Sequence, residues 1–177
     1  HFQMLVFGPM QIIRSALPVM RARRAGTIIN VTSLAARFPV PFLGTYSAAK
    51  AALSSLTWAL QMELLAEPIR FIDLQPGDIC SDFHEQMSRQ ANYPAPYKGN
   101  AKRAFAVYDG NMRRAPPPEL VARAITELVA DNATPHYTAK AVGGFFQARI
   151  APFLSRFALE NLKRHCTSRY YKLRSRP

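Results

Sequence analysis

The chain has 177 residues, the length of one ordinary domain, and hydrophobic residues make up 49% of it. With 19% charged residues, the composition allows a packed core and excludes general disorder, and no apolar run approaches the ~20 residues that span a bilayer. The net charge of +12 favours an anionic partner, but no nucleic-acid motif accompanies it, so we expect no nucleic acid among the partners.

The cysteines and histidines indicate neither a disulfide framework nor a metal centre. Cys80 and Cys166 lie far apart and match no metal-binding or redox spacing, which indicates free thiols in a reducing compartment. The four histidines form no ligand-spaced cluster, so we predict no metal site. No N-terminal segment has the pattern of a signal peptide, and we expect a cytoplasmic protein.

The first half of the chain alternates between helix and strand patterns. Apolar residues recur at helical spacing over residues 2–24, and Gly26 ends that segment. The short β-branched run at residues 27–31 predicts a buried strand of a parallel sheet. A helix is expected from about residue 45 to residue 65, followed by a second strand at 70–74.

The second half is less regular. Residues 78–115 are rich in proline, glycine and aromatic residues and predict a long irregular segment, either a substrate-covering lid or a disordered insertion. A helix at 119–130 and a third strand at 136–142 are expected next. Residues 145–177 form a basic tail with one or two amphipathic helices at 145–165, for which a solvated surface and peripheral contact with an anionic membrane both stay open.

This alternation predicts an α/β fold. We expect a single domain over residues 1–177, built as a partial, doubly wound parallel sheet with a C-terminal helical extension. In such sheets ligands bind beyond the carboxyl ends of the strands. Ser33 and Gly77 each follow such an end, so the predicted architecture places candidate chemistry where a ligand would bind.

Three residues near these strand ends form a pattern suited to proton transfer. Tyr46 and Lys50 lie four residues apart on a predicted helix and therefore share one face. A nearby ammonium favours the phenolate, so we expect a pKa of the Tyr46 phenol below its reference of ~10. Ser33 could donate a hydrogen bond to a carbonyl oxygen or to its developing alkoxide. Together the three indicate a site for a carbonyl–alcohol couple.

These motifs resemble those of the short-chain dehydrogenases/reductases over nearly the whole chain, most securely over residues 2–82. That family has a strand ending in Asn-Val-Ser-Ser, a Tyr-x-x-x-Lys helix and a strand ending in Pro-Gly-x-x-x-Thr. The corresponding residues here are 30–33, 46–50 and 76–81. The resemblance implies a Rossmann-like fold and an oxidoreductase that moves a hydride between NAD or NADP and a ketone or secondary alcohol.

The resemblance also implies a role for each residue. Tyr46 would be the catalytic acid–base, Ser33 would orient the substrate carbonyl, and Lys50 would tune Tyr46 and, with it, bind the nicotinamide ribose. Further residues would line the nicotinamide: Pro76, Gly77, Ile79 and Ser81. Aromatic residues of the irregular segment could join Ser33 around a bulky hydrophobic substrate or simply pack on the domain: Phe83, Tyr93 and Tyr97.

Two departures from the family pattern stand out. Leu5 occupies the position where the family usually has an asparagine that supports a water in the proton relay. The family's glycine-rich cofactor loop would lie before residue 1, so we expect an N-terminally truncated chain that lacks the cradle for the cofactor's phosphates.

These departures leave alternatives open. The chain could be a non-catalytic protein that acts only through partner binding or dimerisation, or a basic protein that binds anionic surfaces. Helices 2–24 and 45–65 correspond to those through which family members usually pair, so the resemblance implies a homo-oligomer formed through them.

Overall fold

The computed structural model describes residues 1–81, 94–131, 137–144, 169, 170 and 172. Within them, three strands form one sheet with the order β1-β2-β3. The elements are, in chain order, the π-helical turn η1 (Gln3–Phe7), α1 (Gly8–Arg23), β1 (Gly26–Val31), the 3-10 turn η2 (Leu34–Ala36), α2 (Gly44–Glu63), β2 (Ile69–Pro76), α4 (Ala95–Met112), α5 (Glu119–Ala130) and β3 (Tyr137–Val142).

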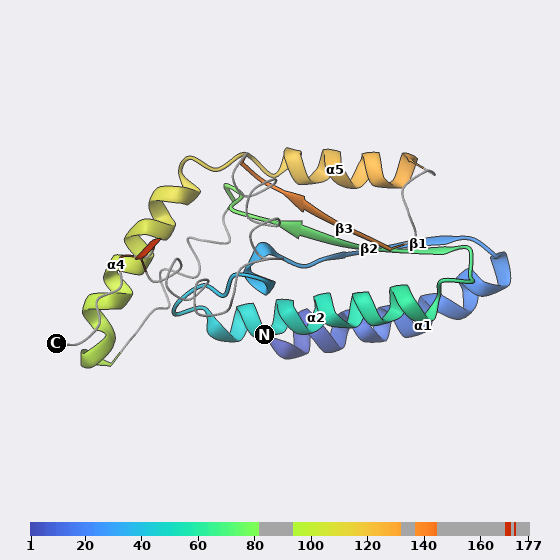
Figure 1. The fold of residues 1–177 in the computed structure, drawn as a ribbon, viewed down its shortest axis with the longest axis horizontal. Helices are drawn as coiled ribbons and strands as arrows, with labels where there is room; N and C mark the ends of the chain where they lie inside the picture. The colour runs from blue at the N-terminus through green and yellow to red at the C-terminus, as the bar shows by residue number, and fades with distance from the viewer. Residues whose placement is uncertain (82–93, 132–136, 145–168, 171, 173–177) are drawn as a thin grey trace.

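The predicted α/β architecture is confirmed. Both strand pairs are parallel, with Val31 of β1 opposite Leu74 of β2, and Leu74 opposite Lys140 of β3. Helices α1 and α2 cover one face of the sheet and α5 covers the other (Figure 1). The connections therefore lie on both faces, as a doubly wound sheet requires, and the carboxyl ends of all three strands meet at one edge.

The core lies on both sides of the central strand β2, which is buried at every position except its last. Towards α1 and the end of α2 the buried residues are Ile13, Leu64, Ile69 and Phe71. Towards α5 they are Ile72, Leu74, Ala124, Leu128 and Val142. Because successive side chains of a strand point to opposite faces, one strand contributes to both cores, which explains why its sequence is an almost continuous apolar run.

The segment at 78–115, predicted to be irregular, contains the helix α4, so that prediction was wrong in part. Pro96 lies in the first turn, where the missing N–H of a proline has no helical partner to lose. Gly99 and Gly110 suggested a loop because glycine has a low helix propensity, yet both lie within α4. The buried side chains of α4 are apolar, and two of them are alanines: Ala101, Ala104 and Met112.

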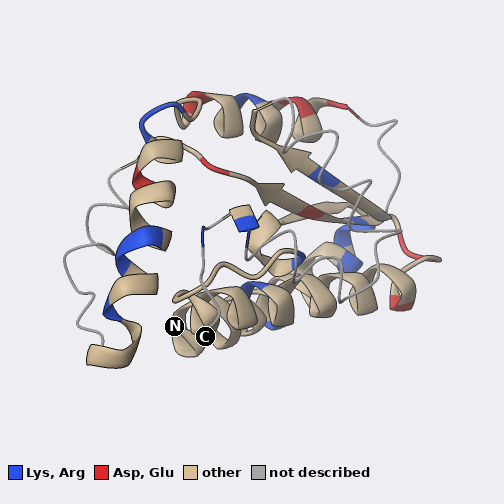
Figure 2. Cartoon of the chain, turned by 60° about the vertical axis from the view of Figure 1, so that its left-hand side comes forward, with Lys and Arg blue, Asp and Glu red and all other residues tan. Residues whose placement is uncertain are grey.

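The basic tail and its predicted helices at 145–165 fall almost wholly outside the described residues. Among the residues that the structure does describe, no helix combines the length and the apolar character needed to cross a membrane. Figure 2 shows Lys and Arg on α4, on β3 and on the helices beneath the sheet. The positive charge of the described residues is thus spread over several elements.

Candidate active site

Ser33 and Tyr46 meet beyond the carboxyl end of β1. Ser33 follows that strand and caps the short turn η2, while Tyr46 lies in the first turn of α2. A side-chain hydrogen bond joins the Tyr46 phenol to the Ser33 hydroxyl. The structure therefore brings together two of the three residues that the sequence singled out.

Backbone groups hold the Ser33 hydroxyl from two sides. Its oxygen accepts a hydrogen bond from the backbone N–H of Ala35 at 3.1 Å and donates one to the carbonyl oxygen of Pro76 at 3.3 Å. Ser33 is only 8% exposed, so the protein rather than water sets the direction of this hydroxyl. The bond to Pro76 also fixes the end of β1 to the end of β2.

Lys50 lies one turn beyond Tyr46 on the same face of α2. Its Nζ atom is 5.9 Å from the centroid of the Tyr46 ring and donates a hydrogen bond to the carbonyl oxygen of Val31 at 2.8 Å. Burial lowers the pKa of the Lys50 ammonium, and the negative charge of Asp73 opposes this shift in part. Lys50 thus connects α2 to the last residue of β1.

The pKa of the Tyr46 phenol shifts in the direction opposite to the one expected. Burial raises this pKa, and the hydrogen bond with Ser33 opposes the rise without cancelling it. The expected lowering by Lys50 was wrong because loss of hydration disfavours the phenolate, while the ammonium is directed at the Val31 carbonyl. Tyr46 therefore keeps its proton at neutral pH, which is the state that a proton donor requires.

The residues predicted to line a nicotinamide follow β2 at the same edge of the sheet. The backbone N–H of the second of them, Gly77, donates to the carbonyl oxygen of Val142 at 2.7 Å, which ties this segment to the end of β3. The N–H of Cys80 donates to the carbonyl oxygen of Pro116 at 2.9 Å. These two bonds anchor the backbone that carries the predicted residues: Pro76, Gly77, Ile79 and Ser81.

Of the aromatic residues predicted to contact a substrate, only one can be placed. Phe83 and Tyr93 lie outside the described residues. Tyr97 lies in the first turn of α4, where it is 57% exposed. Its exposure gives no indication of a contact with Ser33 or Tyr46.

Another aromatic residue, Tyr108 of α4, lies within electrostatic reach of the site. Its pKa is raised strongly, first by burial and then by Asp78, Tyr46 and Asp109. Tyr108 thus lies close enough to both Asp78 and Tyr46 for its pKa to respond to their charges. Sequence reasoning gave Tyr108 no role here, because it assigned this residue to a loop, and it weighed Asp78 as a functional carboxylate but favoured a turn-stabilising role.

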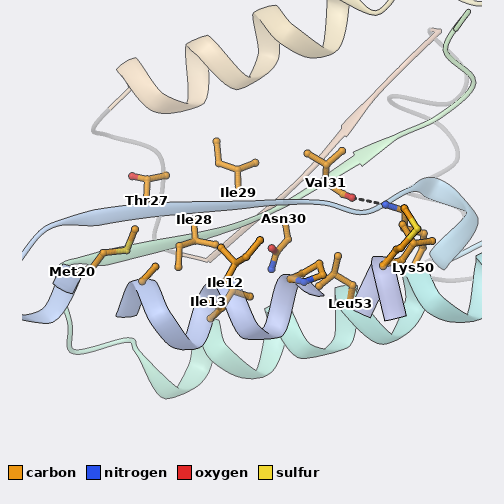
Figure 3. Close-up of a pocket in the computed structure, with 14 residues that line it drawn as sticks. Ile12, Ile13, Met20, Thr27, Ile28, Ile29, Asn30, Val31, Lys50 and Leu53 are labelled. Carbon is orange, nitrogen blue, oxygen red and sulfur yellow. Dashed lines mark hydrogen bonds between the residues drawn. The ribbon is translucent and has the colours of Figure 1, made fainter. Parts of the chain in front are cut away.

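A groove of about 440 Å³ lies between the N-terminal helical segment and β1 (Figure 3). Leu5, which stands where the family usually has an asparagine, and Lys50 both line this groove. Leucine offers no polar atom to hold a water there. Asn30, also in the groove, donates to the hydroxyl of Thr57 at 2.8 Å, which supports a structural role for this asparagine.

Known proteins are similar to this chain in sequence and in fold. The sequence profile of the family described as short chain dehydrogenase matches residues 1–92. A 3-ketodihydrosphingosine reductase of Bacteroides thetaiotaomicron is 28% identical over 170 residues, which cover 95% of this chain and 62% of that protein. An uncharacterised oxidoreductase of Schizosaccharomyces pombe is 24% identical over 131 residues, 74% of this chain and 55% of that protein. The chain thus spans 55–62% of the length of these two curated relatives.

Solved structures give the same picture of the fold. A short-chain dehydrogenase from Streptomyces avermitilis superposes with a TM-score of 0.65 at 24% identity, covering 94% of this chain and 58% of that one. A serine dehydrogenase in its closed form, complexed with NADP+, superposes with a TM-score of 0.61 at 25% identity and covers 81% of this chain and 54% of that one. The arrangement of three parallel strands between helices is therefore shared with enzymes of known structure.

Proposed function

The chain belongs to the short-chain dehydrogenase family, and from that premise we propose that it acts as an NAD(P)-dependent oxidoreductase on a ketone–secondary alcohol couple. The observation that carries the proposal is the hydrogen-bonded pair of Ser33 and Tyr46, with Lys50 one helical turn away, at the edge of the sheet where ligands bind. These are the residue types and the location that the reaction needs.

In carbonyl reduction, residues of this chain would bind the oxygen atom of the substrate carbonyl and transfer a proton to it. The single proton of the Ser33 hydroxyl, which is donated to the Pro76 carbonyl in the structure, would turn to the carbonyl oxygen of the substrate and oppose the charge that develops there. Tyr46 is protonated at neutral pH and transfers its phenolic proton to this oxygen, although the raised pKa makes it a weaker acid than a free tyrosine. The Lys50 ammonium then stabilises the phenolate that remains. In alcohol oxidation the same proton moves in reverse.

The cofactor would lie beside Tyr46, with Lys50 and the segment at 76–81 around its nicotinamide. The nicotinamide supplies the hydride in reduction and accepts it in oxidation. The Lys50 ammonium can donate hydrogen bonds to ribose hydroxyls. The backbone after β2, which is held by hydrogen bonds from Gly77 and Cys80, would offer a fixed surface for the planar nicotinamide ring. The NADP+ bound to the serine dehydrogenase supports NADP as one of the two candidates, NAD being the other.

For the substrate we propose a hydrophobic ketone or alcohol. A relative that matches 95% of this chain is named as a 3-ketodihydrosphingosine reductase. The partly buried Tyr108 of α4 lies near enough to Tyr46 for their charges to interact, so it would add an aromatic side chain to the surroundings of the site. Both observations favour an apolar compound over a small charged one.

The test of this function is binding and turnover with the purified chain. We expect NADPH or NADH to bind saturably, detected as a change in nicotinamide fluorescence, and to raise the melting temperature. We also expect oxidation of the bound cofactor when a panel of hydrophobic ketones is added. If circular dichroism shows a folded chain that neither binds the cofactor nor turns over any ketone, the proposal is contradicted and the non-catalytic alternative is supported.

We further propose that the chain pairs with a second copy of itself through α2. Large apolar side chains are exposed along one side of this helix and its end: Trp58 (67%), Met62 (58%) and Leu65 (58%). They recur at spacings of four and three residues and so form one stripe. A two-fold interface brings identical surfaces together, so a stripe of this kind can bury itself against its own copy.

We expect the wild-type chain to sediment as a dimer and the Trp58→Glu variant as a monomer, because the interface would have to bury an unpaired carboxylate. Sedimentation velocity over a range of concentrations measures this. Val129→Glu is the matched control, since Val129 is 55% exposed on α5 and lies outside the stripe. A wild-type monomer, or a Trp58→Glu dimer, would contradict the pairing.

A further inference from the structure

Asp73 is a buried carboxylate for which the proton-transfer mechanism above has no role. It lies in the middle of β2, on the face towards α2, and is only 5% exposed. Both of its oxygens accept hydrogen bonds, which is the role of an ionised carboxylate. Burying a charge costs free energy unless neighbouring groups donate hydrogen bonds to it or carry the opposite charge. The groups around Asp73 therefore indicate what this carboxylate does.

The donors to Asp73 come from three different segments. The Thr32 hydroxyl donates to Oδ1, from the residue next to Ser33. The Ser54 hydroxyl of α2 donates to Oδ2 at 2.5 Å. The side-chain amide of Gln75, the residue before Pro76, donates to Oδ2 at 2.6 Å. One carboxylate thus joins β1, α2 and β2 just beneath the site.

Each donor is a close neighbour of a residue in the proposed active site. Ser54 lies one helical turn after Lys50 and two turns after Tyr46, so all three occupy the same side of α2. Thr32 precedes Ser33, whose hydroxyl bonds the carbonyl of Pro76. A displacement of the carboxylate would therefore move these segments relative to one another.

Asp73 also supplies a negative charge that acts on the Lys50 ammonium. Its charge raises the pKa of the Lys50 ammonium against the lowering caused by burial. Among the residues that the structure describes, Lys50 also contacts the Tyr46 ring on α2, at 5.9 Å, and the Val31 carbonyl of β1. His1 lies edge-on to Tyr46, with 6.4 Å between ring centroids.

We propose that Asp73 is a positioning residue, whose buried carboxylate ties the segment bearing Ser33 and the Tyr46–Lys50 side of α2 to β2 and provides the counter-charge for Lys50. Its consequence for catalysis rests on the proposed oxidoreductase function. The structural part does not, because the hydrogen bonds and the charge act in the chain whether or not it turns over a substrate.

The first experiment measures Lys50 directly and needs no activity. Trace labelling with acetic anhydride over a range of pH, read by mass spectrometry of the peptide that contains Lys50, gives the pKa of its amine. We expect this pKa to fall in Asp73→Asn, because the amide keeps the shape but removes the charge. In Thr57→Val, the matched control, a buried hydroxyl is lost from the same helix without touching Asp73, and the pKa should not change.

A folded Asp73→Asn variant with the wild-type pKa at Lys50 would overturn the proposal. Should Asp73→Asn fail to fold, Asp73→Ser decides, because it also removes the charge and keeps a small polar side chain within the same set of hydroxyl and amide partners. A lowered pKa at Lys50 in Asp73→Ser supports the proposal, and an unchanged one refutes it. Neither result depends on turnover, so failure here is distinct from failure of the proposed function.

In a chain that turns over substrate, the second experiment is the pH profile of kcat. We expect Asp73→Asn to lower kcat by about 10²-fold through misplacement of the reacting groups. The alkaline limb of the profile should also move to lower pH, since Lys50 loses its proton earlier. Thr57→Val should keep the wild-type profile. If kcat falls but the pH profile does not shift, Asp73 has only a structural role, and the proposal that it provides the counter-charge for Lys50 is contradicted.

Discussion

Replacing Tyr46 by phenylalanine should lower the rate of carbonyl reduction by about 10²- to 10⁴-fold, the range expected when a general acid is removed. The substitution removes the phenolic proton and the hydrogen bond to Ser33 but keeps the ring beside Lys50. Lys50 and the segment at 76–81 remain to hold the cofactor, so we expect its affinity to fall much less than kcat even though the phenol's own contact with the ribose is lost. Steady-state kinetics and cofactor titration measure the two effects separately.

The control for this experiment is Thr57→Val, which removes one hydroxyl from the same helix at a fully buried position away from the site. It should retain turnover at the temperature where it is folded. A Tyr46→Phe variant with a rate close to the wild type would mean that another group or a water donates the proton. A variant with normal kcat but lost cofactor binding would likewise remove the proposed role.

The candidate site could be predicted in part because its residues are fixed by short-range spacing. Tyr46 and Lys50 share a face through helical periodicity alone, and Ser33 follows a strand whose apolar run is unmistakable. The direction of the pKa shift at Tyr46 could not be predicted, because it depends on how much water the folded chain removes from the ring. Spacing carries no information on that quantity.

Asp73 escaped prediction for a different reason. Its donors reach it only because β1 lies beside β2 in a particular register, with Val31 opposite Leu74, and because α2 packs over that face. A shift of the register by one residue would turn Asp73 to the face of α5. Contacts of this kind depend on how the strands and helices pair in the folded chain. The role of a residue that acts through them therefore cannot be predicted from the sequence of its own segment.

The helices also differed in how far local sequence could predict them. The helix at 119–130 was predicted with the bounds that it has in the structure, because its apolar residues recur strictly at helical spacing. The helix α4 was missed because its glycines outweighed its alanines on local propensity, about 1 kcal/mol each in a helix interior. Burial of small side chains offsets that cost, and burial is again a property of the whole fold.

The largest loss of stability is expected from truncation of Phe71 in the central strand. Phe71 is fully buried and belongs to the core cluster with Ile13 and Leu64, where the sheet meets α1 and the end of α2. Phe71→Ala leaves a cavity that the two helices cannot close without moving together, so we expect the free energy of unfolding to fall by about 3–5 kcal/mol. Chemical denaturation followed by circular dichroism measures the change.

A loss of this size is a large fraction of the ~5–15 kcal/mol that stabilises a typical domain, so the variant should be partly unfolded near physiological temperature. Val129→Ala is the control, because its side chain is 55% exposed on α5 and its removal should change the unfolding free energy by no more than about 0.5 kcal/mol. If both variants lost the same small amount, Phe71 would not lie in the main core. The central place of β2 between the two helical layers would then be refuted, and with it the support on which Asp73 and the end of β2 depend.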